Sequence, residues 1–210
     1  MITYTPQSVR YTDILRAVKN RLVSRRVTSD RPMTSGETQE SFIYISRTAS
    51  PAGYPTERWI RIYPGSLGSV SESPTGFGVK THDGGRWDTR AIRSLIVELF
   101  TRCDADQVGD GEVSLIGEVD AVRRNEIGAE IGHLSMEEAV IDALHMWVPT
   151  NKDINPSIPD DQIKPLTYQP IFLRSAESPP QDDRSRGYIV SRLVFETAYL
   201  MKLEIVLPDN

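Results

Sequence analysis

The sequence predicts an α+β fold in which two main helices cover a β-sheet that closes with a long hairpin. The final stretch, 188–206, has apolar side chains at most odd positions and several charged side chains between them. Side chains of a strand alternate between faces, so this stretch predicts a strand with one apolar face. Two other stretches, 12–26 and 135–148, repeat apolar residues at helical spacing, which predicts amphipathic helices.

The first predicted helix spans 12–26, and Thr12 or Asp13 is placed to cap its N-terminus. Basic residues occupy the positions away from its apolar stripe. This pattern predicts a helix that lies on a sheet with its basic face outward. The stripe consists of Ile14, Leu15, Val18 and Leu22.

Short strands are predicted next, where β-branched and aromatic residues stand between loops rich in Gly, Ser and Pro. They span 41–47, 57–63 and 77–81, the last ended by the turn-like segment 82–85. In the second strand, alternation assigns Trp59 and Arg61 to one face and Ile60 and Ile62 to the other.

The stretch 89–102 fits both a helix and a strand. Its apolar residues form a helical stripe with Asp88 as a cap, and the pattern alone slightly favours a helix. The segment SLIVELF within it also fits a buried strand, and periodicity does not decide between the two for a short apolar run.

The second main helix is predicted at 135–148. Ser135 and Glu138 have the spacing of a capping box, Leu134 occupies the position of a hydrophobic staple, and Pro149 is expected to end the helix. The weakly patterned segment 118–132 before it allows a further short helix.

The C-terminal part of the chain predicts an antiparallel hairpin with a long tip. A proline-rich excursion at 149–165 precedes a strand at 168–174, a polar loop at 175–187 and the closing strand. The closing stretch is far longer than a usual strand of about 5–6 residues. It therefore predicts either a bend at a bulge or a projection toward a neighbouring subunit.

Charge is distributed unevenly along the chain. The formal net charge is −5, yet residues 1–35 contain seven Arg or Lys residues and two Asp residues, so that the remainder carries −10. This asymmetry indicates either complementary surfaces on neighbouring copies or a solvated helix face. The negative total argues against a free-standing nucleic-acid-binding protein.

The sequence also indicates where the protein works. Cys103 is the one cysteine, which excludes an intrachain disulfide and is typical of assembly in a reducing cytosol. The first residues, MITYTPQSVR, lack the apolar core of a signal peptide. No apolar run approaches the roughly 18 residues of a membrane span, so no membrane contact is expected.

No catalytic, cofactor or metal site is predicted. Asp104, Asp106 and Asp110 match the first, third and seventh places of a calcium loop, but Leu115 stands where the bidentate Glu is required. The three histidines, His82, His133 and His145, are far apart in the sequence. Neither G-x-S-x-G, H-E-x-x-H nor a glycine-rich phosphate loop is present.

The order of elements resembles the tail terminator, or tail completion, family of long-tailed bacteriophages, the minor tail protein U-like proteins. Three stretches carry the resemblance: 13–26 as the opening helix, 90–104 as the central strand with an apolar-acidic-apolar core, and 188–202 as the closing strand. Residues 137–147 would form the sheet-covering helix. The resemblance implies a strand at 90–102, against the helical preference of the pattern.

As a fold, the resemblance implies one α+β domain over 1–210, with a mixed, mostly antiparallel β-sheet covered by two main α-helices. This chain is longer than a compact member, and the excess would lie in loop insertions at about 105–134 and 149–187. The chain would end in a long C-terminal β-hairpin.

As a function, the resemblance implies a structural virion protein that forms a ring, commonly a hexamer, at the head-proximal end of the tail tube. Such a ring stops tube polymerisation and contacts the tail tube protein below and the head-completion or connector protein above. DNA would pass through its lumen without specific binding. The protein would be assembled in the host cytoplasm and located in the tail or neck of the virion.

A ring needs two different patches that meet around the circle. The candidates for one side are Arg16, Arg25 and Arg26. The candidates for the other side are the acidic 104–112 loop, with Asp104, Asp106 and Asp110, and the 149–165 excursion, with Ile154 and Ile158. Three alternatives remain: a neck or head-closure adaptor between portal and tail, a soluble enzyme, and an unrelated binding module.

Overall fold

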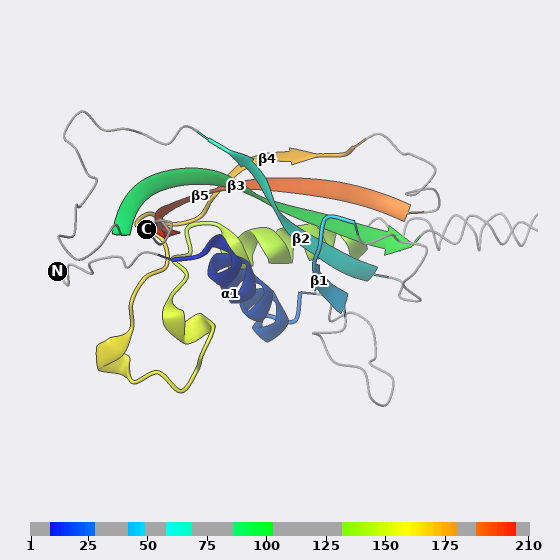
Figure 1. The fold of residues 1–210 in the computed structure, drawn as a ribbon. Helices are drawn as coiled ribbons and strands as arrows, with labels where there is room; N and C mark the ends of the chain where they lie inside the picture. Colours follow the sequence, from blue (N-terminus) through cyan, green and yellow to red (C-terminus); the bar gives the residue numbers. More distant parts are fainter. Residues whose placement is uncertain are drawn as a thin grey trace, which may run out of the picture.

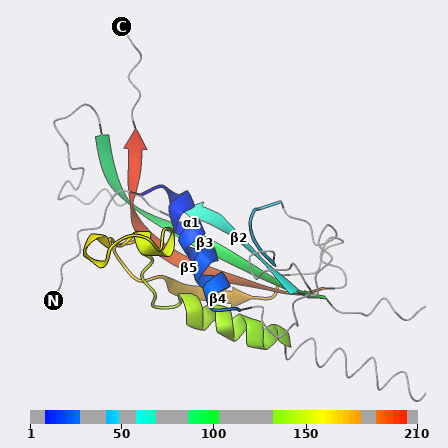
Figure 2. The same cartoon turned by 90° about the horizontal axis from the view of Figure 1, so that it is seen from below.

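A computed structural model of the protein describes residues 9–27, 42–48, 58–68, 86–102, 132–179 and 188–204 (Figure 1). Within them, a five-stranded sheet has the strand order β1-β2-β3-β5-β4. β1 is parallel to β2, and each of the other neighbouring pairs is antiparallel. Two long helical segments lie on one face of this sheet, in front of the strands in Figure 2. The predicted α+β fold with a mixed, mostly antiparallel sheet is therefore confirmed.

Helix α1 spans Tyr11–Ser24, and the whole predicted apolar stripe is buried against the sheet. Its N-terminus differs from the prediction, because Arg10 is the N-cap and makes no capping side-chain hydrogen bond. Neither Thr12 nor Asp13 caps the helix. The backbone N–H of Asp13 instead donates to the Arg10 carbonyl at 2.9 Å, so the first turn is closed by the backbone.

The strands alternate as the sequence predicts. They span Ile43–Ile45 (β1), Arg58–Leu67 (β2), Arg86–Arg102 (β3), Phe172–Glu177 (β4) and Tyr188–Glu204 (β5). In β2, Ile60 and Ile62 face the helices, whereas Trp59 lies on the opposite face and stacks on Phe100 with ring centroids 3.9 Å apart. The predicted strand at 77–81 and the turn at 82–85 lie outside the described residues.

Residues 86–102 form strand β3, so the helical preference of the pattern was wrong and the strand implied by the resemblance is confirmed. Leu95 and Leu99 face the helices, while Glu98 and Phe100 are buried on the opposite face. Residues 97–100 of this run are all buried, so the end of the strand lacks the simple alternation of a half-exposed strand.

Residues 132–144 are helical and cover the sheet beside α1. The predicted capping box is wrong, because Ser135 lies inside this helix and Leu134 is 58% exposed. The helix also ends before Val148. Met146 adopts a left-handed backbone with φ 61°, and its N–H donates to the Ile171 carbonyl at 2.8 Å. This turn redirects the chain earlier than Pro149 would.

The predicted C-terminal hairpin is confirmed, since β4 pairs antiparallel with β5. The predicted bounds of its first strand, 168–174, were wrong, because β4 begins at Phe172 and continues to Glu177 into the predicted loop. β3 and β5 pair over their full lengths without a register shift, from Arg86↔Glu204 to Arg102↔Tyr188. β5 is therefore not broken by a bulge in this pairing, and the long alternating stretch forms one side of a continuous two-stranded ribbon.

The excursion at 149–165 is an ordered loop with two short 3₁₀ turns, η4 (Asn151–Asp153) and η5 (Asp160–Gln162). An antiparallel bridge between Thr150 and Pro165 closes its base. In Figure 1 the loop extends away from the sheet beside α1.

Candidate assembly surfaces

The β3–β5 ribbon continues past its neighbouring strands. The outermost registered pair of β2 with β3 is Leu67↔Arg93, and that of β4 with β5 is Phe172↔Glu196. We call residues 86–92 of β3 and 197–204 of β5 the ribbon extension. Figure 2 shows both strand ends reaching beyond α1.

The base of the ribbon extension is fastened by short contacts. The Gly68 N–H donates to the Ile92 carbonyl at 2.8 Å. On the other edge, the N–H groups of Val9 and Tyr168 donate to the carbonyls of Leu200 and Ala198 at 2.9 and 3.0 Å. Beyond these contacts, the registered strand pairs of the described residues run only between β3 and β5.

The backbones of β3 and β5 remain in register to the end of the ribbon extension. Trp87 and Leu203 are register partners there, as are Thr89 and Met201.

Of the basic candidates, Arg16 lies on α1 as predicted, whereas Arg25 and Arg26 follow the end of the helix at Ser24. Arg16 has a side chain that is 65% exposed and is 3.9 Å from Asp13, while Arg25 and Arg26 are exposed at the C-terminal end of the helix. Arg26 has φ 51°, the left-handed conformation that commonly ends a helix. Arg21 points inward instead, where its Nε donates to the Ala143 carbonyl at 3.2 Å and its guanidinium lies over the Trp147 ring.

The 149–165 loop keeps a defined shape through its own side chains. Asn151 donates to the Gln162 carbonyl at 3.1 Å and accepts from the Lys164 N–H at 2.8 Å. The Thr150 N–H and hydroxyl both donate to Asp153 Oδ2 at 2.7 Å. Lys152 forms an ion pair with the exposed Asp160. These contacts order a loop that the sequence predicts only as irregular.

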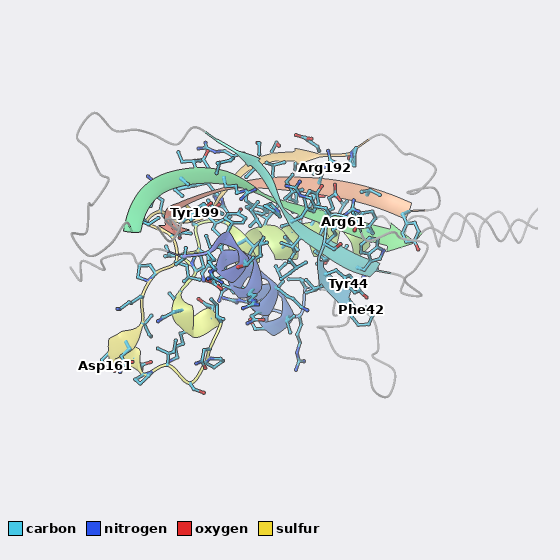
Figure 3. All side chains as sticks on the ribbon, in the orientation of Figure 1. Phe42, Tyr44, Arg61, Asp161, Arg192 and Tyr199 are labelled. Atoms are coloured by element: carbon cyan, nitrogen blue, oxygen red, sulfur yellow. The ribbon has the colours of Figure 1, made fainter. Side chains whose placement is uncertain are left out.

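The two isoleucine candidates of this loop have different positions. Ile154 packs against the main core, and Ile158 is half-buried. Asn20 of α1 donates to the Asp153 carbonyl at 2.8 Å, so the loop and α1 adjoin within one chain. Asp161 lies at the outer end of the loop in Figure 3. Asp104, Asp106 and Asp110 lie outside the described residues.

The face of the sheet opposite the helices carries a line of polar and charged residues that the sequence analysis did not identify. Tyr44, Arg61, Glu98, Arg192 and Glu177 are successive register partners across all five strands. At its centre, Glu98 is only 1% exposed. Arg61 and Arg192 of this line are labelled in Figure 3.

Three side chains satisfy the Glu98 carboxylate. Arg61 Nε donates to Oε2 at 2.6 Å, Arg192 Nε donates to Oε1 at 2.9 Å, and the Tyr63 hydroxyl donates to Oε1 at 2.6 Å. Burial alone would raise the pKa of Glu98, but these hydrogen bonds and the two guanidinium charges lower it below the ordinary value. Burial and the bond to Glu98 raise the pKa of Tyr63 to about 12. At neutral pH the Glu98 carboxylate is thus ionised, and its hydrogen bonds connect β2, β3 and β5.

The described histidines do not converge on one site. His133 is buried between Thr101 and Ser191, whereas His145 is exposed and its Nδ1 accepts the Leu173 N–H at 3.2 Å. They are twelve residues apart at opposite ends of one helix, which corresponds to about 18 Å at 1.5 Å per residue. His82 lies outside the described residues.

The described residues contain no group of three or more His, Cys, Asp or Glu side chains that could hold a metal ion. None of their helices is long and apolar enough to cross a membrane.

Comparison with known proteins finds similarity in structure but not in sequence family. No protein-family model matches the chain, and no curated protein sequence matches it. Among solved structures, the chain is similar to a chain from the virion of a native gene transfer agent particle, with 11% sequence identity and a TM-score of 0.44. The match covers 89% of this chain and 94% of that chain. A similarity at this level concerns the path of the backbone.

Proposed function

We propose that this chain is a structural protein of a phage-like virion and assembles as a ring at the head-proximal end of a tail tube. There it would end tube polymerisation and present the surface to which the head connector binds. The family that the sequence resembles supplies this role, and the order of helix, central strand, covering helix and closing strand agrees with it.

The ribbon extension is the observation that carries the proposal. A two-stranded ribbon is at best marginally stable alone in water and normally requires a third strand or a packed face. The described residues place the extension beyond β2 and β4, so contacts from outside its own sheet would stabilise it. A neighbouring subunit can supply them through strand addition at an edge of the extension.

The arrangement suits a ring more than a simple dimer. A ring uses heterologous contacts, in which one patch of a subunit meets a different patch of the next. The ribbon extension and the basic C-terminal end of α1 lie in different parts of the subunit (Figure 2). The charge asymmetry between residues 1–35 and the remainder is consistent with a second, electrostatic component of such a contact.

The first experiment is the mass of the purified protein by light scattering, followed by electron microscopy of any large species. We expect a closed ring of about six copies with an open centre, on its own or after addition of tail tube protein. Rings that bind a portal but never cap a tube would replace the terminator role with that of a neck adaptor. A monomer that stays monomeric with tube and portal proteins would contradict the proposal.

A variant pair tests the role of the ribbon extension. Replacing Trp87 and Leu203 by Asp places charges at one register pair near the end of the extension. We expect the ring to be lost while the monomer remains folded by circular dichroism. Leu134→Asp is the control, because Leu134 is 58% exposed and lies beside His133, near the opposite end of β3 and β5. Rings that persist with the double substitution would contradict this use of the extension.

A further inference from the structure

A buried histidine fastens one end of the sheet-covering helix to two strands. His133 is 3% exposed and belongs to the helical segment 132–144. Its Nδ1 is 2.8 Å from the Thr101 hydroxyl on β3, and its Nε2 is 2.9 Å from the Ser191 hydroxyl on β5. Thr101 and Ser191 are 2% and 7% exposed, so water has little access to the group.

Both ring nitrogens of His133 have a suitable hydrogen-bond partner when the imidazole is neutral. A neutral imidazole has one N–H donor and one acceptor nitrogen, and each hydroxyl can donate or accept. Either tautomer can therefore be satisfied by Thr101 and Ser191. When the ring is protonated, both nitrogens donate and both hydroxyls must accept, which turns the two hydroxyl hydrogens toward other partners. The charge must also be accommodated in a buried site.

The charged groups near His133 come from its own helix and from β2. Glu137, one turn further along the helix, favours the protonated ring, whereas Arg58 at the start of β2 opposes it. Arg58 lies close to the helix backbone, because a Cβ placed on Gly132 would be 1.7 Å from its Nη2. β3 and β5 contribute the two hydroxyls, while Glu98 and Arg192 of these strands belong to the other face of the sheet.

We propose that His133 is a proton-sensitive latch, whose protonation loosens the attachment of the 132–144 helix to β3 and β5. The neutral ring holds the helix to the sheet, and acid weakens this contact. The latch concerns the folded subunit itself and does not depend on the proposed ring.

The direction of the effect follows from the pKa values in the two states. Burial lowers the pKa of His133 in the folded protein, while an unfolded histidine has a pKa of about 6.5. Between these two values the unfolded or locally open state binds the proton more strongly. The contribution of the latch is therefore fully present above about pH 6.5 and decreases as the pH falls toward the folded pKa.

Hydrogen exchange of the helix amides at pH 5.0 to 7.5, corrected for intrinsic exchange rates, tests this proposal. We expect the opening equilibrium of residues 134–144 to increase as the pH falls, by at most about tenfold per pH unit, the limit for one proton. His133→Gln should remove this pH dependence. His145→Gln should keep it, because His145 is the exposed histidine just beyond the same helix.

A second measurement keeps the test decisive if His133→Gln fails to fold. The imidazole of His133 can be titrated by NMR in the wild-type protein, with His145 as an internal comparison. A titration midpoint at or above about 6.5 for His133 would overturn the proposal. The same would follow from equal pH dependence of exchange in the wild type and in His133→Gln.

Discussion

Arg61 and Glu98 are register partners on β2 and β3, and the Arg61 guanidinium donates through both Nε and Nη2 to Glu98 Oε2. The Glu98 side chain is 2% exposed and that of Arg61 is 19% exposed, so the pair is largely removed from water. Arg192 binds the other carboxylate oxygen from β5. The carboxylate thus joins the three central strands on the face away from the helices.

Removing the charge of Glu98 should be costly. Glu98→Gln keeps the size of the side chain but leaves two guanidinium groups without their carboxylate, and breaking a buried pair typically costs about 3–5 kcal/mol. Chemical denaturation with circular dichroism measures the loss. A triple substitution, Arg61→Met, Glu98→Leu and Arg192→Met, should restore much of the stability, because no unpaired charge then remains. A loss below about 1 kcal/mol for Glu98→Gln would contradict this account.

The same cluster predicts acid sensitivity. The pKa of Glu98 is lower in the folded protein than in the unfolded chain, so its contribution is present above its unfolded pKa and is lost as the pH falls through its folded pKa. In wild-type protein we expect a steeper decrease of the unfolding free energy below about pH 4.5 than in the triple variant. Parallel pH profiles of the two proteins would argue against this role of Glu98.

Tyr11 should stabilise the packing of α1 on β3 and β5. Its hydroxyl donates to the Ser94 carbonyl and lies 3.2 Å from Thr197 Oγ1, and burial raises its pKa. Tyr11→Phe keeps the ring contact with Tyr199 but leaves these polar groups without the hydroxyl, which should cost about 1 kcal/mol. Arg16→Ala, an exposed change on the same helix, should stay within about 0.5 kcal/mol in the same denaturation experiment.

Replacing Met146 by glycine should increase the stability of the protein. Its φ of 61° is unfavourable for a side chain bearing Cβ, and 58% of the residue is exposed, so little packing is lost. We expect Met146→Gly to stabilise the protein by about 1 kcal/mol, as a left-handed residue after a helix favours glycine. Met146→Ala retains Cβ and should give no such gain. Equal thermal midpoints for the two variants would show that backbone strain at this position is negligible.

Charge reversal tests the basic end of α1 as a subunit contact. Arg25→Glu with Arg26→Glu should lower the fraction of protein in rings, because repulsion would replace attraction to an acidic surface of the next copy. The matched control is Arg10→Glu, an exposed change at the other end of the helix. Light scattering at low and high salt measures the effect, and unchanged ring formation would remove these residues from the contact.

Local patterns in the sequence determine much of this fold. The stripe of α1 is buried as predicted, and the odd positions of β5, such as Leu193, Phe195 and Tyr199, face the core. The same local reasoning was wrong at β3, where burial on both faces hides the period of two. It was also wrong at Ser135, because a capping motif has the same spacing within a helix as at its start.

The polar clusters depend on partners that are distant in the chain, and this explains why the sequence did not reveal them. Glu98 interrupts the apolar run SLIVELF, which signals an unusual carboxylate, but Arg61 and Arg192 become its partners only through the sheet register. His133 likewise meets Thr101 and Ser191 through three separate elements. The spacing of residues in the sequence does not indicate which distant side chains come into contact.

The contact between Tyr11 and Thr197 joins residues 186 positions apart, and Val9 likewise binds Leu200. During translation, α1 therefore leaves the ribosome long before β5, on which it packs, has been synthesised. Until β5 has been synthesised, the apolar stripe of α1 lacks part of its final binding surface, and the central strand β3 lacks one neighbour. We therefore expect the chain to complete its fold only after β5 has been synthesised, so that products that stop before β5 would expose apolar surface and be prone to aggregate.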